Sequence, residues 1–218
     1  MSKKVKTKKR KLNYFLYDFV KITGVPLMWP FLRPKFIYEN EQAKQKIKGG
    51  ALLISNHSGK IDPIVALFPL WYRRQHFVTT KELFDTKLKR WFFTRMHCIE
   101  IDRDDVSMQS FKRIISYLKD EKVVSIFPEG RVTNTEEVQK FKSGAVLMSI
   151  LAQKPIVPIY QQKRTSIFQR QRIIIGQTID VAKILNGKPS LSEIDKVSEL
   201  LREKEKQLKD IAYGLRGK

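Results

Sequence analysis

Cysteine and long apolar runs are what this chain has least of. Its 218 residues include a single cysteine, Cys98, which excludes an internal disulfide and a cysteine-rich metal site and is typical of an intracellular protein. No uncharged run is longer than the one that covers residues 22–32, which has about half of the roughly 20 residues that a transmembrane helix needs. The three histidines, His57, His76 and His97, show no metal-ligand spacing, so we expect no metal site. A Gly-x-Ser-x-Gly sequence is also absent, which argues against a serine nucleophile.

Negative charge is scarce as well. The chain has 43 Lys and Arg against 22 Asp and Glu, which gives a net charge of +21. This excess calls for an anionic partner: nucleic acid, an acidic membrane or a phosphorylated substrate. Seven of the first 11 residues are cationic. We therefore predict that residues 1–11 form a basic, disordered arm.

Residues 12–48 differ in character, because aromatic and aliphatic side chains dominate their first part. Asp18 and Lys21 interrupt the first half of this apolar stretch, which makes it a poor signal peptide, and Pro26 and Pro30 break the second half. Aromatic side chains and lysines both favour the surface of an anionic membrane. We predict an amphipathic, membrane-associating helical segment over 12–48. The alternative is a helix packed on the domain beside a solvated basic tail.

Residues 49–218 alternate between short apolar runs and amphipathic stretches. This alternation predicts a single α/β domain, with a mixed, largely parallel sheet flanked by helices. We expect strands at 51–55, 76–79, 98–101, 123–127, 155–159 and 172–176, and helices at 63–71, 86–96, 104–119, 144–153 and 191–213.

The most informative stretch, 55–63, follows the first of these strands and contains His57 and Asp62. Four residues separate the two, which lets a tight loop bring the carboxylate against one imidazole nitrogen. The carboxylate would fix the tautomer of His57 and leave the other nitrogen free as a general base. The alternative is purely structural, with Asp62 as the N-cap of the next helix and Pro63 in its first turn.

Other polar side chains also follow expected strands. Arg103 ends the segment 100–103, and Glu129 and Arg131 lie in 124–131. Because parallel strands place their carboxyl ends at one edge of a sheet, these residues and His57 can converge there. The planar guanidinium fork of arginine suits phosphate, although a surface ion pair explains each arginine alone equally well.

These blocks, taken in order, resemble the glycerolipid acyltransferases. The blocks are Asn56-His57 with Asp62-Pro63, Ile101-Asp102-Arg103, Phe127-Pro128-Glu129-Gly130, Phe141-Lys142-Ser143-Gly144 and Val157-Pro158-Ile159, and they span roughly residues 50–160. Within these enzymes the chain is most similar to the 1-acylglycerol-3-phosphate (lysophosphatidic acid) acyltransferases. The resemblance implies transfer of a fatty acyl group to a lysophospholipid hydroxyl. It implies no bound cofactor, because an acyl thioester of coenzyme A or of acyl carrier protein is the co-substrate.

The resemblance also assigns roles to positions. It implies that His57 is the base, that Asp62 orients it, and that Arg103 and Lys81 bind the acceptor phosphate. Glu129 and Gly130 would shape the acceptor pocket. The family usually has Thr and then Arg after Phe-Pro-Glu-Gly, whereas here Arg131 follows directly, one position early. The role of Arg131 and the acceptor headgroup therefore stay open, with lysophosphatidylethanolamine as one alternative to lysophosphatidic acid.

Two other functions fit the charge of the chain. A nucleic-acid-binding protein would need basic and aromatic residues interleaved on one face, but here the aromatic residues cluster near the N-terminus and no binding module is recognisable. A membrane-surface protein without activity would not need His57, Asp62 and Glu129 together. We therefore expect an enzyme that is membrane-associated (monotopic or peripheral), on the cytoplasmic face, with an anionic membrane surface as partner and no nucleic acid.

Overall fold

The computed structural model describes residues 13–102, 107–133, 137–166, 168–185 and 189–214. Two sequence-based predictions fall outside these ranges: the basic arm at 1–11 and the position of Arg103. Within them, a seven-stranded sheet runs in the order β1-β7-β6-β2-β5-β3-β4. The strands are β1 (Lys35–Tyr38), β2 (Ala51–Ser55), β3 (Gln75–Thr80), β4 (Ile99–Ile101), β5 (Val123–Ile126), β6 (Ile156–Gln161) and β7 (Arg172–Ile175).

The predicted fold class, a single α/β domain with a mixed, largely parallel sheet, is confirmed. All neighbouring strands of this sheet pair in parallel except β6 and β7. Every residue of β2, the strand that leads to His57, is buried. A strand covered on both faces needs no alternation of apolar and polar residues, which is why Ala51–Ile54 reads as a continuous apolar run.

The strand β1 was not predicted. It pairs with β7 from Lys35↔Arg172 to Tyr38↔Ile175, so the sheet reaches back into the stretch 12–48. A four-residue edge strand between prolines and a polar turn gives too short a pattern to recognise. Whether 12–48 works as a membrane-associating unit, distinct from 49–218, remains a prediction.

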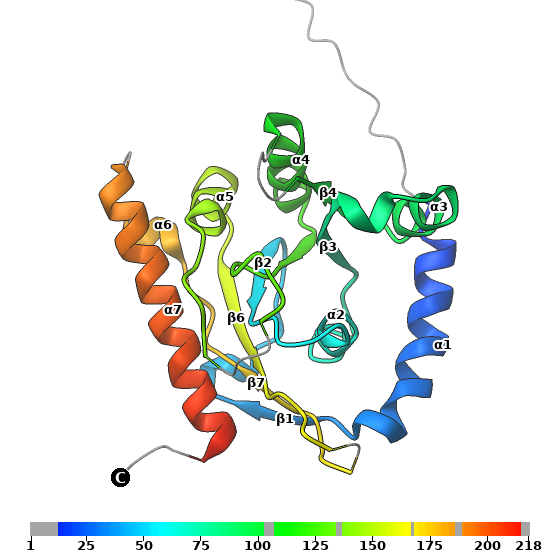
Figure 1. Cartoon of the computed structure of the whole chain (residues 1–218). Coiled ribbons are helices and arrows are strands. Elements are labelled where there is room, and N and C mark those ends of the chain that lie inside the picture. Colours follow the sequence, from blue (N-terminus) through cyan, green and yellow to red (C-terminus); the bar gives the residue numbers. More distant parts are fainter. Residues whose placement is uncertain (1–12, 103–106, 134–136, 167, 186–188, 215–218) are drawn as a thin grey trace, which may run out of the picture.

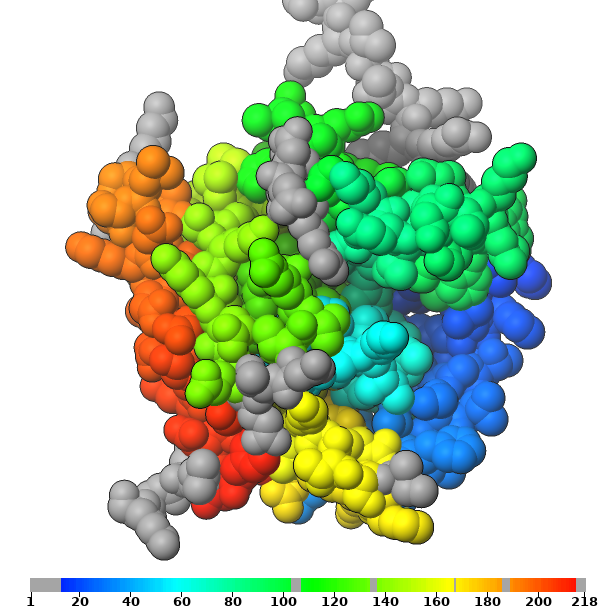
Figure 2. Space-filling model, in the orientation of Figure 1, coloured from blue at the N-terminus to red at the C-terminus, as the bar shows by residue number. Residues whose placement is uncertain are grey.

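Helices cover both faces of the sheet (Figure 1). The helices α4 (Met108–Lys119), α5 (Gly144–Ala152), α6 (Val181–Ile184) and α7 (Leu191–Tyr213) pack on one face, where their side chains join Leu52 and Ile54 of β2 in one apolar core. On the other face, α1 (Phe15–Leu32) and α2 (Asp62–Val65) pack with Ala51 and Leu53. The space-filling view shows α7, in orange and red, on the opposite side of the molecule from α1 in blue (Figure 2).

Two connecting segments complete the chain at its edges. The helix α3 (Lys87–Arg95) and the short 3₁₀ helix η2 (Lys81–Phe84) follow β3, and a second 3₁₀ helix, η1 (Gln42–Lys44), follows β1. Cys98 is buried against Phe77 and Phe84, and burial raises the pKa of its thiol to about 12. A thiol in that environment is an apolar core residue and not a nucleophile.

The helix expected at 63–71 is shorter than predicted. The α-helix α2 ends at Val65, and the chain continues to Trp71 in turns whose hydrogen bonds reach back three residues, as from Phe68 N–H to the Val65 carbonyl. Pro69 explains the change, because it has no N–H to donate and it disfavours helical geometry at the residue before it.

The helix α1 runs unbroken through Pro26 and Pro30, which the sequence analysis took as breaks. Both prolines are exposed, so each removes one helical hydrogen bond at a position where water reaches the freed carbonyl. The cap residue Arg33 has φ of 43°, and its N–H donates to the Trp29 carbonyl. No helix in the described ranges is both long enough and apolar enough to cross a membrane.

Hydrogen bonds attach the beginning of α1 to the domain. The Tyr14 hydroxyl lies 2.9 Å from His76 Nε2, and His76 Nδ1 lies 3.0 Å from the Val123 carbonyl oxygen. A carbonyl only accepts, so the hydrogen is on Nδ1 and Nε2 accepts from Tyr14. Burial lowers the pKa of His76 to about 4, which keeps the imidazole neutral and makes it structural.

Candidate active site

Five strands end at the same edge of the sheet and bring several of the predicted residues to that edge. His57 follows β2, Lys81 follows β3, Asp102 follows β4, and the turn at 127–130 follows β5. The neighbouring strand β6 ends at Gln161. All five strands are parallel to one another, which is the physical reason for the convergence.

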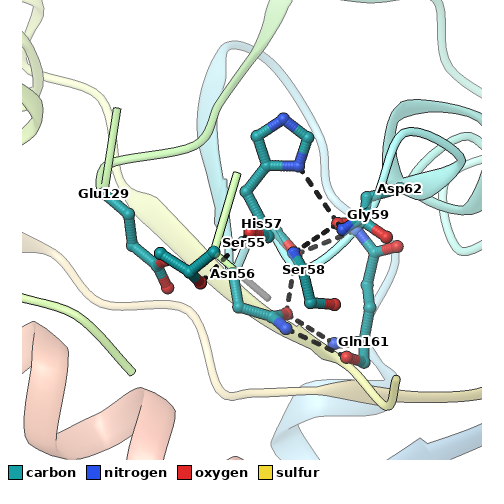
Figure 3. Close-up of polar contacts among 9 residues, drawn as sticks. Ser55, Asn56, His57, Ser58, Gly59, Asp62, Glu129 and Gln161 are labelled. Carbon is teal, nitrogen blue, oxygen red and sulfur yellow. Dashed lines mark hydrogen bonds and ion pairs between the residues drawn. The ribbon is translucent and has the colours of Figure 1, made fainter. Parts of the chain in front are cut away.

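His57 and Asp62 form a hydrogen-bonded pair, as the spacing suggested (Figure 3). His57 Nδ1 lies 3.0 Å from Asp62 Oδ2. The same oxygen accepts hydrogen bonds from the backbone N–H groups of Ser58, at 2.6 Å, and Gly59, at 2.8 Å. Only 15% of the His57 side chain and 8% of the Asp62 side chain are exposed. The helix N-cap is Ile61, and Asp62 does not cap α2, so the structural alternative for Asp62 is wrong.

The contact with Asp62 decides the tautomer of the neutral histidine ring. A carboxylate only accepts hydrogen bonds, so Nδ1 of neutral His57 carries the hydrogen. Nε2 then holds a free lone pair and can accept a proton from a substrate hydroxyl. The ring also stacks on Phe127, with centroids 4.2 Å apart and planes inclined by 19°. The hydrogen bond to Asp62 and the stacked Phe127 ring together hold the imidazole in one orientation.

The backbone on either side of His57 is held as well. The Asn56 side-chain amide donates to the Gln161 carbonyl at 3.0 Å, and its oxygen accepts the Gln161 N–H at 2.8 Å. The N–H of Thr133 donates to the His57 carbonyl at 2.9 Å. These bonds connect the His57 loop to β6 and to the chain beyond β5. Neither Gln161 nor Thr133 stands out in the sequence.

Residues 127–130 form a tight turn that presents Glu129. The Gly130 N–H donates to the Phe127 carbonyl at 3.0 Å, and Gly130 has φ of 71°, a conformation that favours glycine. Glu129 is only 8% exposed. Burial raises the pKa of its carboxyl to about 7, against the opposing effects of hydrogen bonds from Gln139 and Thr133 and of nearby His57. Glu129 therefore lies close to His57.

A pocket of about 170 Å³ opens beside His57. Its walls are mainly apolar, with Val78, Ile101, Ile126, Phe127 and Met148 among the lining residues, and Gly130 and Lys142 also line it. A Cβ added to Gly130 would lie 3.4 Å from Lys142 Cε. Lys142, which the sequence analysis quoted without giving it a role, thus adds a positive charge to the pocket that His57 faces.

The remaining predicted residues lie at or beyond the rim. Lys81 Nζ lies 2.5 Å from Asp102 Oδ2, and neither side chain lines the pocket. Arg131 is exposed, and Arg103 falls outside the described residues. Among the residues that the structure describes, no group of three or more His, Cys, Asp and Glu side chains is arranged to hold a metal ion.

A larger hollow, of about 830 Å³, lies between α1 and the beginnings of β3 and β5. It is therefore at the opposite edge of the sheet from His57. Its cationic side chains have partners: Arg74 forms two hydrogen bonds with Asp18, and Arg73 donates to the carbonyls of Ile47, Gly49 and Glu121. Of these two pockets, the smaller one is the candidate site, because His57 lines it and does not line the larger one.

Comparisons with known proteins identify the family of the chain. The acyltransferase family model matches residues 35–162. The chain is 30% identical over 166 residues to the 1-acyl-sn-glycerol-3-phosphate acyltransferase of Bacillus subtilis, an alignment that covers 74% of this chain and 82% of that one. It is 25% identical over 174 residues to the enzyme of the same name from Streptococcus pneumoniae, covering 77% of this chain and 64% of that one.

The fold has a solved counterpart in the 1-acyl-sn-glycerophosphate acyltransferase of Thermotoga maritima. The two structures superpose with a TM-score of 0.63 at 16% identity, over 88% of this chain and 79% of the other. The match of the family model over more than half of the chain, together with the Bacillus relative, shows the resemblance seen in the sequence to be a true relationship. The chain belongs to the acyltransferase family and is an acyltransferase.

Proposed function

We propose that the protein is a 1-acyl-sn-glycerol-3-phosphate O-acyltransferase. It transfers a fatty acyl group from a thioester of coenzyme A or acyl carrier protein to lysophosphatidic acid, and the product is phosphatidic acid. The observation that carries this proposal is the His57–Asp62 pair, with Nε2 of His57 free, at the mouth of an apolar pocket. The named relatives support the choice of acceptor.

His57 acts as the base in the proposed reaction. Nε2 takes the proton of the acceptor hydroxyl while the hydroxyl oxygen attacks the thioester carbonyl carbon. The carbon–sulfur bond then breaks, and the leaving thiolate takes the proton back from the imidazolium. Asp62 stabilises the positive charge that the ring carries between these two steps. General-base help of this kind accelerates a reaction by about 10²–10⁴-fold, and no acyl-enzyme is needed because the thioester is already activated.

The acceptor phosphate binds to the cationic residues around the pocket. Lys142 lines the pocket, and Lys81 lies at the same edge of the sheet. The resemblance adds Arg103, and Arg131 follows the turn that presents Glu129. Holding the phosphate fixes the distance between the acceptor hydroxyl and Nε2, which lowers the entropic part of the barrier. The apolar side chains of the pocket suit the hydrocarbon beside the reacting carbonyl.

The outer surface of α1 supports attachment to a membrane. Phe15, Phe19 and Ile22 are 79%, 58% and 71% exposed, and their spacing places them on one side of the helix. The two charged residues of α1 are both held by the domain: Asp18 binds Arg74, and Lys21 Nζ donates to the Arg73 carbonyl. Large apolar side chains in water are unfavourable, so this face is suited to the interface of an anionic membrane. We propose peripheral or monotopic attachment on the cytoplasmic face.

The test is transfer of a labelled acyl group in vesicles. Wild type and His57→Ala are supplied with a long-chain acyl thioester of coenzyme A or acyl carrier protein, and with lysophosphatidic acid, lysophosphatidylethanolamine or lysophosphatidylglycerol. We expect phosphatidic acid from wild type and none above background from His57→Ala, with both proteins folded by circular dichroism.

Two results would count against the proposal in different ways. Transfer only to another lysophospholipid would keep the reaction and change the acceptor, in line with the displaced Arg131. Wild-type transfer by His57→Ala would remove His57 from the mechanism.

A further inference from the structure

A carboxyl group on α7 has no part in the reaction described so far. Glu205 is completely buried, and neither of its carboxyl oxygens has a hydrogen-bond partner among the described residues. Burying an unpartnered carboxyl destabilises a fold, because the group loses its hydration and gains nothing in return. The alternating charges of this helix predict a solvated face, and Glu205 is an exception because it is buried. A buried, unpartnered carboxyl suggests a functional role.

Glu205 lies behind the loop that carries His57. Burial, and after it the charge of Glu129, raise the pKa of the Glu205 carboxyl well above its ordinary value, whereas the backbone N–H of Asn56 acts to lower it. Asn56 is the residue before His57, and Glu129 belongs to the turn after β5. Glu205 therefore lies close to the two segments from which the site is built, and its carboxyl holds a proton more tightly than an ordinary carboxyl does.

A second contact connects α7 to the same region. Arg202, one turn before Glu205, donates from Nε to the Val138 carbonyl at 3.2 Å. Val138 is buried and borders a small gap that is also lined by Asn56, His57 and Glu129. The helix α7 thus supports the site from behind through two neighbouring turns.

We propose that Glu205 is a positioning residue of the acyl-transfer site, whose buried carboxyl lies against the backbone of Asn56 and so sets the position of His57. A carboxyl group suits this place because its carbonyl oxygen can accept from Asn56 while its hydroxyl hydrogen remains available to the Glu129 side. This inference rests on the proposed function, since it takes His57 as the base. The titratable groups around Glu205 are Glu129 and, beyond it, His57, Asp62 and Glu137.

The experiment compares three substitutions at Glu205. Glu205→Gln keeps a neutral acceptor of the same length, Glu205→Leu removes all hydrogen bonding, and Glu205→Asp withdraws the carboxyl by one methylene. The matched control is Glu203→Leu, on the same helix at a side chain that is 54% exposed. Each variant is measured for kcat and KM in acyl transfer, for the pH profile of kcat, and for thermal stability.

We expect Glu205→Gln to keep kcat within about twofold of wild type with the same pH profile, because the amide keeps the length of the side chain and an oxygen that can accept a hydrogen bond. In Glu205→Leu and Glu205→Asp we expect kcat to fall roughly 10- to 100-fold with little change in KM, as displacement of a catalytic group by an ångström does. Glu205→Leu should melt no lower than wild type, because it removes a buried carboxyl. A loss of rate without a loss of stability distinguishes positioning from packing.

Several results would overturn the proposal. Wild-type kcat in Glu205→Asp would do so even if Glu205→Leu failed to fold, and so would a loss of kcat in Glu205→Gln. A readout that needs no acyl transfer is the rate at which diethylpyrocarbonate modifies His57, followed by peptide mass spectrometry. That rate should change in Glu205→Asp and stay unchanged in Glu205→Gln. If His57→Ala remains active, the proposed function fails; if His57→Ala is inactive and Glu205→Asp is not, only this inference fails.

Discussion

Asp62→Asn isolates the electrostatic contribution of the carboxylate while leaving the shape of the side chain nearly unchanged. In the native protein one oxygen of Asp62 accepts from the Ser58 N–H, the Gly59 N–H and His57 Nδ1. An amide oxygen that stays on the two backbone donors carries no charge. An amide turned the other way presents its NH₂ to Nδ1, which moves the imidazole hydrogen to Nε2 and removes the free lone pair.

The distance in the structure sets the size of the effect. When His57 takes up a proton, its positive ring lies 3.0 Å from the carboxylate, and unit charges at that distance attract by about 5 kcal/mol at an effective dielectric constant of about 20. Loss of that attraction corresponds at most to about 10⁴ in rate. We expect kcat to fall by about 10²–10⁴-fold. Three hydrogen bonds to the charged carboxylate become hydrogen bonds to a neutral amide, and each loses about 1 kcal/mol of its stabilising effect. The free energy of unfolding should therefore fall by about 2–3 kcal/mol.

The assay is single-turnover acyl transfer beside urea unfolding at the same pH. The control is Asp180→Asn, which changes an exposed carboxylate that lies 3.6 Å from Lys183, and it should leave both quantities nearly unchanged. If Asp62→Asn transferred acyl groups at the wild-type rate while His57→Ala did not, the carboxylate would have no part in the mechanism and the reasoning would be refuted.

Three further outcomes follow from other parts of the molecule. Glu129 binds its proton more tightly in the native protein, with a pKa of about 7 against the ordinary 4.5, so folding stability should fall as pH rises from 4.5 to 7; urea unfolding of Glu129→Gln should lack this fall. His76 has its pKa lowered from 6.5 to about 4, so the unfolded chain takes up that proton first and stability should be lost as pH falls between these values, by roughly 3 kcal/mol in all. A His76→Gln variant that still lost this amount would contradict the assignment. Phe19→Glu on the exposed face of α1 should weaken sedimentation with anionic vesicles by about tenfold or more, whereas unchanged binding would mean that another surface attaches.

Much of the fold could be predicted because its elements have strong local patterns. The strand Ala51–Ser55 and the helix Leu191–Tyr213 lie where the sequence placed them. The first is a continuous apolar run, and the second begins with a complete capping box between Ser190 and Glu193. The strand Lys35–Tyr38 escaped prediction, because a short edge strand is defined by its partner β7 and not by its own pattern.

The candidate active site likewise has contacts that the sequence predicts and contacts that it does not. His57 and Asp62 are close in sequence, so their spacing was enough to predict the contact between them. The partners of the His57 loop come from far along the chain: Gln161 from the end of β6, and Thr133 from beyond β5. Glu205 could not be recognised from the sequence, because there it is one of many charged residues on a long helix. Burial distinguishes it from the others, and burial is not a local property.

The sequence by itself determined the family, the class of reaction and the sheet edge at which the candidate site lies, because motifs and strand order are written along the chain. Tertiary structure decided which charges are buried. The packing of α7 against β6 and β7 buried Glu205 and raised the pKa of its carboxyl, and the way α1 lies on the domain left Phe15, Phe19 and Ile22 exposed. The physical reason is that desolvation depends on everything that surrounds a group, and distant segments supply those surroundings only when the chain has folded.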